Sequence, residues 1–502
     1  GMNWAPAHIP PRQLRQIFML PFEAAVKEAN LQSVMHAYQE LDGIPCAASR
    51  ELLIEILRGE WGFDGLVVSD YFGIEELHRT HHLTGNCQDS ARLALAAGID
   101  SELPHTNCYG DPLRQAVKAG LVDEALIDRS VARILHMKFK LGLFENPYVD
   151  AGRTVTVFDT PEQRELARQI AQKSIVLLKN EHDLLPLAKN IRSVAVIGPN
   201  AHTERHLIGD YAYLCHIESL IEMRDRDNVF DMPVPDSIEL IDAFVPMKTI
   251  LQTLRDRLSH HTTIYYAKGC DVTGDDASDF AEAVAAARQA EVALLFVGGK
   301  SGLTDSCTCG EARDRASLDL PGVQAELVRA IHATGTPVVV VLINGRPLSV
   351  NWAAEHVPAI VEAWLPGEEG AEAVVDVLFG DVNPGGKLPI TFPRSVGQIP
   401  IYYNHKPSGG RSHWKGAYAD LSNKPLWPFG FGLSYTQFRL DNLQIDRRQV
   451  RAGEQVGIRV DITNVGARAG DEVVQLYVRD LIASVTQPVK SLQGFKRVHL
   501  KP

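Results

Sequence analysis

The first 150 positions alternate between amphipathic stretches and short apolar runs. Apolar residues fall at helical spacing over 10–30, where Pro21 is a candidate break. Further helical patterns cover 49–59, 89–97 and 113–143. Short runs typical of strands occupy 33–38, 66–68 and 98–103. This alternation of strand and helix predicts a parallel sheet.

The stretch 65–73, Gly-Leu-Val-Val-Ser-Asp-Tyr-Phe-Gly, combines a predicted buried strand with a carboxylate at its end. In α/β barrels the carboxyl ends of the strands hold the catalytic groups, so Asp70 is a candidate catalytic residue. The alternative is that Asp70 only caps a helix predicted at 74–78. This stretch by itself leaves both interpretations open.

Residues 151–425 repeat the alternation and predict a second, open doubly wound α/β sheet. The predicted helices are 161–176, 279–289 and 323–333, and the predicted strands are 193–198, 263–266, 292–298, 338–343, 359–361 and 388–392. A polar segment at 218–246 has no place in this pattern.

After 427–432 the hydrophobic period changes to two. Val456, Ile458, Val460 and Ile462 alternate with polar residues, and 473–478 forms a further strand pattern. This predicts an antiparallel β-sandwich, which ordinarily needs about 100 residues. The expected domains are therefore 1–150, 151–425 and 426–502.

Charge and composition exclude several classes of function. A formal net charge of -12 argues against a nucleic-acid partner, and no apolar run is long enough to cross a membrane. The seven cysteines are scattered and predict no disulfide framework. The sequence does not distinguish between a periplasmic, a secreted and a cytoplasmic protein. It also does not fix the oligomeric state, and a homodimer is one of the states it allows.

Two groups of residues are candidate metal ligands. Cys307 and Cys309 lack a second pair, so free thiols are favoured over a zinc site. His78, His81 and His82 cluster after the 65–73 stretch, but no third-ligand pattern accompanies them. We therefore expect no metal.

A second carboxylate lies in the charged loop 309–322, where Glu311 precedes Arg313 and Arg315. Such a loop is ordinarily a solvated cluster of salt bridges. Two carboxylates from different domains are, however, what a glycosidase places across its sugar-binding cleft, one to attack and one to carry a proton.

Several segments in order along the chain resemble glycoside hydrolase family 3, specifically its three-domain β-glucosidase type. Residues 61–70 are similar to the family's nucleophile segment, and 33–45 to the strand and turn before it. Further similar segments are 97–100, 140–144, 196–200, 381–389 and 428–435.

This resemblance implies both the fold and the site. The expected fold is the C-terminal part of a (β/α)8 barrel, then an α/β sandwich domain, then a partial fibronectin type III β-sandwich. Asp70 is implied to be the nucleophile and Glu311 the general acid and base. Tyr38 matches a family tyrosine near the nucleophile, and Tyr71 stands where many members have a tryptophan lining the sugar site. Asp100 matches a recurrent aspartate that is either structural or catalytic.

The implied activity is retaining hydrolysis of non-reducing terminal β-D-glucosyl residues from β-glucosides or oligosaccharides, without metal or organic cofactor. A β-xylosidase or related pentosidase is the alternative within the family. A non-catalytic carbohydrate-binding or interaction fragment is the alternative from another class. The matched barrel region covers only about three of eight strands, so the chain is expected to be incomplete at both ends and poorly active.

Overall fold

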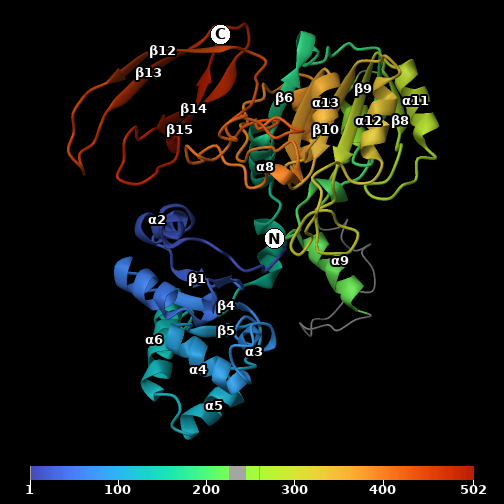
Figure 1. Cartoon of the computed structure of the whole chain (residues 1–502). Helices are drawn as coiled ribbons and strands as arrows, with labels where there is room; N and C mark the ends of the chain where they lie inside the picture. The colour runs from blue at the N-terminus through green and yellow to red at the C-terminus, as the bar shows by residue number, and fades with distance from the viewer. Residues whose placement is uncertain (1, 225–244, 259) are drawn as a thin grey trace. The chain divides into compact units, whose positions relative to one another are not determined.

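The computed structural model describes residues 2–224, 245–258 and 260–502 (Figure 1). The chain forms two compact units, Gly1–Arg153 and Thr154–Pro502. We call them unit 1 and unit 2 and describe each by itself.

Unit 1 is built on a parallel sheet of three strands, β1 (Ser33–Met35), β4 (Leu66–Tyr71) and β5 (Ser101–Leu103). β4 is the central strand and pairs in parallel with both neighbours. The three predicted strand runs are thus confirmed as a parallel sheet, although β4 extends beyond 68 and β1 ends before 38. A small hairpin of β2 (Glu40–Leu41) and β3 (Ile44–Pro45) follows β1.

Helices surround this sheet and supply most of its core. They are α1 (Pro11–Gln13), η1 (Leu14–Phe18), α2 (Leu20–Glu28), η2 (Cys46–Ala48), η3 (Glu51–Glu60), α3 (Glu76–Arg79), α4 (Cys87–Ala97), α5 (Asp111–Lys118), α6 (Glu124–Lys140) and η4 (Ala151–Arg153). Pro21 lies in the first turn of α2, where its missing N–H costs nothing, rather than inside a helix. Leu53 of η3, Val67 of β4 and Leu95 of α4 pack together in the core.

Unit 2 contains a six-stranded sheet in the order β6-β11-β10-β9-β7-β8. Its strands are β6 (Val176–Asn180), β7 (Ser193–Ile197), β8 (Thr263–Ala267), β9 (Val292–Gly298), β10 (Val338–Ile343) and β11 (Ala359–Trp364). Five strands are parallel, and β6 pairs antiparallel with β11. After β7 the chain adds β8 on one side of the sheet, and after β9 it adds β10 and β11 on the other side. The sheet therefore has a topological switch point between β7 and β9.

Two expectations for unit 2 were wrong. The helix predicted over 161–176 ends at Ser174, and the unpredicted strand β6 begins at Val176, with Ile175 alone between them. The strand predicted at 388–392 is not a regular strand, because Pro389 has no N–H for a ladder. Only its ends pair with 426–431, where Leu388 N–H donates to Phe431 O and Phe392 N–H to Trp427 O.

Successive residues of the sheet point to opposite faces, and helices cover both faces (Figure 1). Phe296 packs with α8 (Pro161–Ser174), α10 (Ile250–Arg257) and α14 (Gly370–Leu378). Val297 packs on the other face with α11 (Phe280–Gln289), α12 (Gln324–His332) and α13 (Asn351–His356). The remaining helices are α7 (Thr154–Val157), η5 (Glu181–Asp183), η6 (Arg205–Leu207), α9 (Tyr213–Met223) and η7 (Val396–Gln398). The polar segment 218–246 begins in α9, and its residues 225–244 lie outside the described residues.

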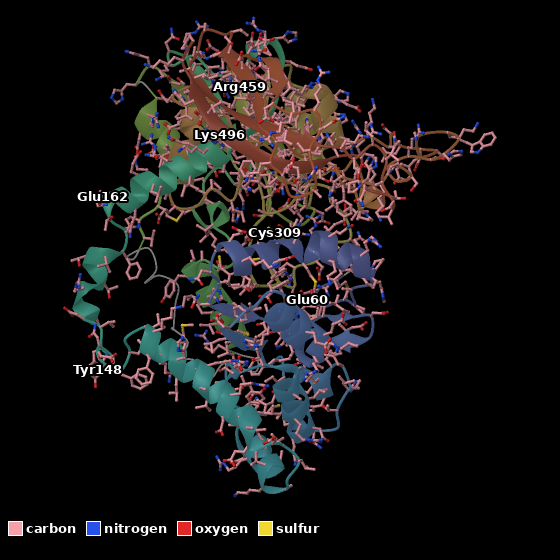
Figure 2. All side chains as sticks on the ribbon, turned by 90° about the vertical axis from the view of Figure 1, so that its left-hand side faces the viewer. Glu60, Tyr148, Glu162, Cys309, Arg459 and Lys496 are labelled. Carbon is pink, nitrogen blue, oxygen red and sulfur yellow. The ribbon has the colours of Figure 1, made fainter. Side chains whose placement is uncertain are left out.

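The C-terminal region consists of two antiparallel ribbons, β12 (Phe438–Ile445) with β13 (Ile458–Asn464) and β14 (Gly470–Val478) with β15 (Ser491–Leu500). Figure 2 labels Arg459 on β13 and Lys496 on β15. The predicted antiparallel pattern is confirmed. Among the described residues, none of the helices has the length and hydrophobicity that crossing a membrane would take.

Candidate active site

Asp70 lies near the carboxyl end of β4, the central strand of the unit 1 sheet. Its Oδ1 accepts a hydrogen bond of 2.7 Å from the N–H of Tyr71. The next helix, α3, has Glu75 at its N-cap position and no side-chain cap. The interpretation of Asp70 as a helix cap is therefore wrong, and the carboxylate stands at the strand edge where catalytic groups are found.

A tight turn after Asp70 sets the direction of the strand end. Gly73 N–H donates to the Asp70 carbonyl oxygen at 3.0 Å, and Phe72 N–H to Leu103 O of β5 at 2.8 Å. Phe72 adopts a φ of 60°, a left-handed conformation that is uncommon for non-glycine residues. A Cβ on Gly73 would lie 2.5 Å from Cε1 of His36, so only glycine fits there.

Tyr38 and Tyr71 both lie close to Asp70 in unit 1. The hydroxyl of Tyr38 donates a hydrogen bond of 2.7 Å to the carbonyl oxygen of Tyr71, and the Tyr38 ring stacks on Trp4 with 4.1 Å between centroids. The Tyr71 side chain is 47% exposed. The fold thus brings together three of the four predicted site residues, Asp70, Tyr38 and Tyr71, at the end of β4.

His36 is a neighbour of Asp70 that the sequence analysis missed. Its side chain is buried, its Nδ1 lies 3.0 Å from Ala37 O, and its Nε2 has no hydrogen-bond partner within the described part of the chain. Burial lowers the pKa of His36, and the Asp70 charge opposes that shift only in part. A neutral imidazole therefore packs against the turn. The only signal in the sequence was a histidine two positions before Tyr38.

Asp100 has a structural role. Its fully buried carboxylate accepts hydrogen bonds from Arg58, Arg133, Ser130 Oγ and the N–H of Val67, at 2.8 to 3.0 Å. These contacts connect β4 with η3 and α6. Both carboxylate oxygens of Asp100 are therefore occupied inside unit 1. This favours the structural role of Asp100 over the catalytic role, the two that the sequence left open.

Glu311 lies in unit 2, in the long loop between β9 and α12. Its N–H donates to Asp210 Oδ2 at 3.0 Å, and the Tyr211 hydroxyl donates to its Oε2 at 2.5 Å. Asp210 and Tyr211 belong to the loop that follows β7. Loops after β7 and β9 flank the switch point of the sheet, the usual place for a ligand in doubly wound folds. The sequence analysis missed Asp210 and Tyr211 because they lie about a hundred positions before Glu311 in the chain.

The loop before Glu311 folds back on itself. Thr308 N–H donates to Lys300 O at 2.8 Å, and Gly302 N–H to Cys309 O at 3.0 Å. Gly310 has a φ of +127°, and a Cβ there would lie 2.2 Å from Gly302 O. Cys309, labelled in Figure 2, is a buried residue of this loop. Glu311 therefore projects from a compact, hydrogen-bonded support.

The two arginines after Glu311 bind the loop rather than Glu311. Arg313 donates to Asp305 Oδ1 and O at 3.0 and 2.8 Å, and Arg315 donates to Asp319 O at 3.3 Å. Across the residues that the structure describes, neither donates a hydrogen bond to the Glu311 carboxylate. The Glu311 carboxylate accepts a hydrogen bond from Tyr211 instead.

Within the described ranges, one group of side chains is close enough together to hold a metal ion, and it shares only His78 with the two sequence candidates. It consists of Glu75, His78 and Cys87 in unit 1. Cys307 and Cys309 are buried free thiols without such a group. His81 and His82 point their ring nitrogens to the backbone oxygens of Tyr38 and His78.

Comparison with protein families matches nearly the whole chain. Residues 1–137 match the glycosyl hydrolase family 3 N terminal domain, 175–435 the glycosyl hydrolase family 3 C-terminal domain, and 472–502 a fibronectin type III-like domain. The fold class expected from the sequence is thereby confirmed.

Known proteins with similar sequences and structures include both glucosidases and a xylosidase. A beta-xylosidase of Formosa agariphila is 43% identical and a periplasmic beta-glucosidase of Salmonella typhimurium 35% identical, each over 100% of this chain and over 66% and 65% of those proteins. A solved β-glucosidase of Erythrobacter marinus superposes with a TM-score of 0.87 at 37% identity, over 100% of this chain and 65% of that one. The glucose complex of a Listeria innocua beta-glucosidase superposes with a TM-score of 0.86 at 32% identity, over 100% of this chain and 64% of that one. The chain thus spans about two thirds of the length of these proteins.

Proposed function

Since the chain belongs to glycosyl hydrolase family 3, we propose that it carries both catalytic carboxylates of a retaining exo-acting β-glucosidase. Asp70 is the proposed nucleophile and Glu311 the proposed general acid and base. The observation that carries this proposal is the setting of Asp70, which stands at the end of the central parallel strand and is held by the turn at Phe72.

The proposed reaction has two displacements. The Asp70 carboxylate attacks the anomeric carbon, the glycosidic bond breaks, and the Glu311 carboxyl gives its proton to the leaving oxygen. A water molecule then attacks the glycosyl-enzyme ester, Glu311 takes the proton of that water, and Asp70 is released as the carboxylate. The net reaction consumes one water and retains the anomeric configuration.

The neighbouring side chains have supporting parts in this proposal. Tyr38 holds the peptide of Tyr71 and thereby the backbone on which Asp70 stands. Tyr211 holds Glu311 through its carboxylate oxygen. The exposed ring of Tyr71 offers an apolar face on which a sugar ring can stack.

A β-xyloside is the second candidate substrate. The β-xylosidase of Formosa agariphila is more similar in sequence than the β-glucosidase of Salmonella typhimurium, at 43% against 35% identity. Xylosides lack the hydroxymethyl group of glucosides, so the ratio of kcat/KM for matched nitrophenyl glucosides and xylosides separates the two. We expect the glucoside to be preferred by at least about tenfold, the scale on which one positioned group discriminates.

Covalent trapping tests the proposal at Asp70. The purified chain is incubated with a 2-deoxy-2-fluoro-β-glucosyl fluoride, and its peptides are analysed by mass spectrometry. We expect one adduct on Asp70, none in Asp70→Asn, and an unchanged adduct in Asp64→Asn, an exposed aspartate of the same segment.

Turnover of nitrophenyl β-glucoside that persists in Asp70→Asn would contradict the assignment. Oligosaccharide binding without an adduct and without turnover would favour instead the non-catalytic carbohydrate-binding alternative.

A further inference from the structure

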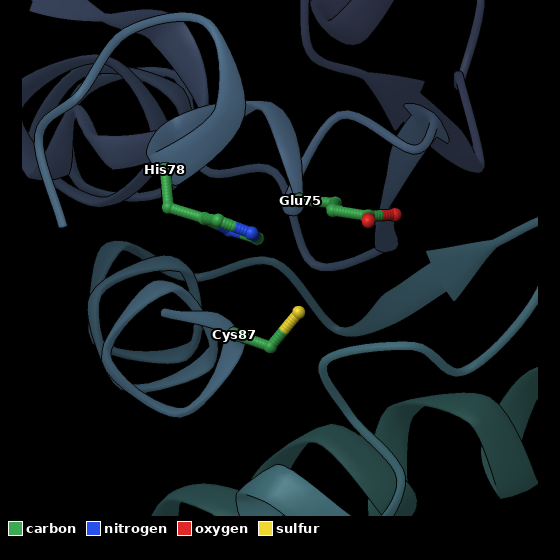
Figure 3. A group of neighbouring side chains, drawn as sticks. All are labelled: Glu75, His78 and Cys87. Carbon is green, nitrogen blue, oxygen red and sulfur yellow. The ribbon is translucent and has the colours of Figure 1, made fainter. Parts of the chain in front are cut away.

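Three side chains of different chemistry converge just beyond the turn that follows Asp70. Glu75 occupies the N-cap position of α3, His78 lies within α3, and Cys87 is the first residue of α4. One carboxylate oxygen, one imidazole nitrogen and the thiol sulfur all lie within 4.8 Å of one another (Figure 3). All three residues are half-buried. Glu75 and His78 are three positions apart, so the first turn of α3 presents both on one face.

A second layer of polar groups orients the three side chains. Asn107 donates to Glu75 Oε2 at 2.9 Å, and Arg79 to Glu75 Oε1 at 3.3 Å. Ser90 Oγ lies 3.4 Å from Nδ1 of His78, and Thr84 Oγ1 lies 2.7 Å from Ser90 Oγ. Metal-binding histidines and carboxylates are commonly held by such outer hydrogen bonds, which keep the ligand atoms aimed at the ion.

We propose that Glu75, His78 and Cys87 form a binding site for a divalent cation of the zinc class. Thiolate, imidazole and carboxylate together suit zinc, whereas calcium and magnesium take oxygen ligands. Three protein ligands leave a fourth position for water. Cys87 binds as the thiolate, so each ion bound releases the thiol proton to solvent.

The geometry requires only small side-chain movements. Zinc bonds of about 2.0 to 2.3 Å place the ligand atoms of a tetrahedral site about 3.5 Å apart. Torsions of three half-buried side chains therefore have to draw the atoms together by about 1 Å. The other two histidines of this segment already contact backbone oxygens, which leaves His78 as the imidazole directed at the group.

A bound ion would cross-link α3 to α4 and close the loop 80–86 between them. Because an ion that binds only the folded state stabilises it by mass action, zinc raises the unfolding temperature of unit 1. Neither the site nor this effect depends on glycoside hydrolysis.

The test uses the full chain, freed of metal with a chelator and kept reduced. Reduction matters because Cys87 and Cys108 are neighbours, and an oxidised pair would offer no thiolate. Zinc binding is measured by calorimetry, and cobalt is added as a spectroscopic probe. We expect one equivalent to bind, with a thiolate-to-cobalt charge-transfer band in the near ultraviolet and a rise in unfolding temperature.

Two ligand variants, one variant of an orienting residue and two controls test the site. Cys87→Ser loses the charge-transfer band, and His78→Asn weakens zinc binding by at least about tenfold. Ser90→Ala keeps all three ligands and weakens binding by about 10- to 100-fold through lost orientation. The matched controls are Cys46→Ser, a buried thiol of the same unit, and His82→Asn, an exposed neighbouring histidine; both bind as the unmodified chain does.

The proposal is overturned if the unmodified chain binds no zinc. It is equally overturned if Cys87→Ser keeps the band, or if His78→Asn binds as tightly as His82→Asn. Circular dichroism of each variant verifies that it is folded.

Discussion

The hydroxyl of Tyr211 donates a hydrogen bond of 2.5 Å to Oε2 of Glu311. The two residues come from the loops after β7 and β9, on either side of the switch point of the unit 2 sheet. Together with Asp210, which accepts a hydrogen bond from the Glu311 N–H, Tyr211 thus holds the proposed acid and base in position.

Removing this hydroxyl tests its importance. A hydrogen bond to a charged group contributes about 1.5 to 3 kcal/mol, so Tyr211→Phe is expected to lower kcat/KM for a nitrophenyl β-glucoside by about 10- to 100-fold. Tyr418→Phe, an exposed tyrosine elsewhere in unit 2, serves as the control. Equal activity of the two variants would contradict a positioning role for Tyr211.

Glu311→Ala tests the proposed acid and base by its dependence on the leaving group. Phenols that leave readily need no proton, so dinitrophenyl β-glucoside should be hydrolysed at a first-step rate close to that of the unmodified chain. Phenyl β-glucoside should slow by about 10²- to 10⁴-fold. Azide should restore part of the turnover by attacking the glycosyl-enzyme without a base. Asp275→Ala, an exposed carboxylate of unit 2, is the control. Equal losses on both substrates without rescue would exclude Glu311 as the acid.

Tyr38→Phe tests the support of the backbone beside Asp70. It removes the hydrogen bond to Tyr71 O and leaves the stacking on Trp4. We expect a loss of about 0.5 to 1.5 kcal/mol in the free energy of unfolding of unit 1, together with a several-fold lower kcat. Tyr148→Phe, whose ring is 85% exposed, should change neither quantity. Unfolding in urea and initial rates measure the two effects separately.

Asp100→Ala tests a structural role in unit 1. The change would leave the nearly buried guanidinium of Arg58 and that of Arg133 without their shared carboxylate. Breaking a buried ion pair by removing one partner costs about 3 to 5 kcal/mol. We expect a loss of that size in urea unfolding, against almost none for Asp64→Asn on the surface. A fully stable Asp100→Ala chain would return Asp100 to the candidate catalytic residues.

Glu362 on β11 predicts a pH dependence of stability. Complete burial raises its pKa to about 8, although Asn344 and the N–H of Trp364 donate to its carboxylate. Below a pH of about 4.5 both folded and unfolded chains hold this proton. As the pH rises towards 8 only the unfolded chain loses it, so this group lowers the free energy of unfolding by about 1.4 kcal/mol per pH unit over that window.

Glu362→Gln has no proton to lose and should abolish this slope. Urea unfolding of unit 2 at several pH values from 5 to 8 measures it, with the exposed Glu355→Gln as the control. Parallel pH profiles for the unmodified chain and Glu362→Gln would show that the carboxyl ionises in the folded state.

Local patterns were sufficient for most of the fold. The run at Leu66–Tyr71 is apolar and β-branched, and any buried parallel strand needs that composition. The errors occurred where local signals conflict. Ile175 joins α8 to β6 without a turn residue, so periodicity did not separate the helix from the strand.

The site was only partly predictable for a different reason. Asp70 was suggested by its strand segment, and Tyr38 and Glu311 were implied by the family resemblance. The contact of Glu311 with Tyr211 was not predictable, because the two residues are a hundred positions apart and meet only because β7 and β9 are adjacent in the sheet. The same holds for Glu75 and Cys87, which are separated by a loop and brought together by the packing of α3 on α4.

The sequence by itself determined most of the strands and helices, although not β6, because periodicity and side-chain shape act over a few residues. It also determined the two candidate carboxylates, through the motifs around them. The tertiary structure decided what holds each carboxylate, that Asp100 is structural, and that His78 lies beside Cys87 as well as Glu75, rather than grouping with His81 and His82. Those contacts depend on strand order and helix packing, which no local pattern in the chain records.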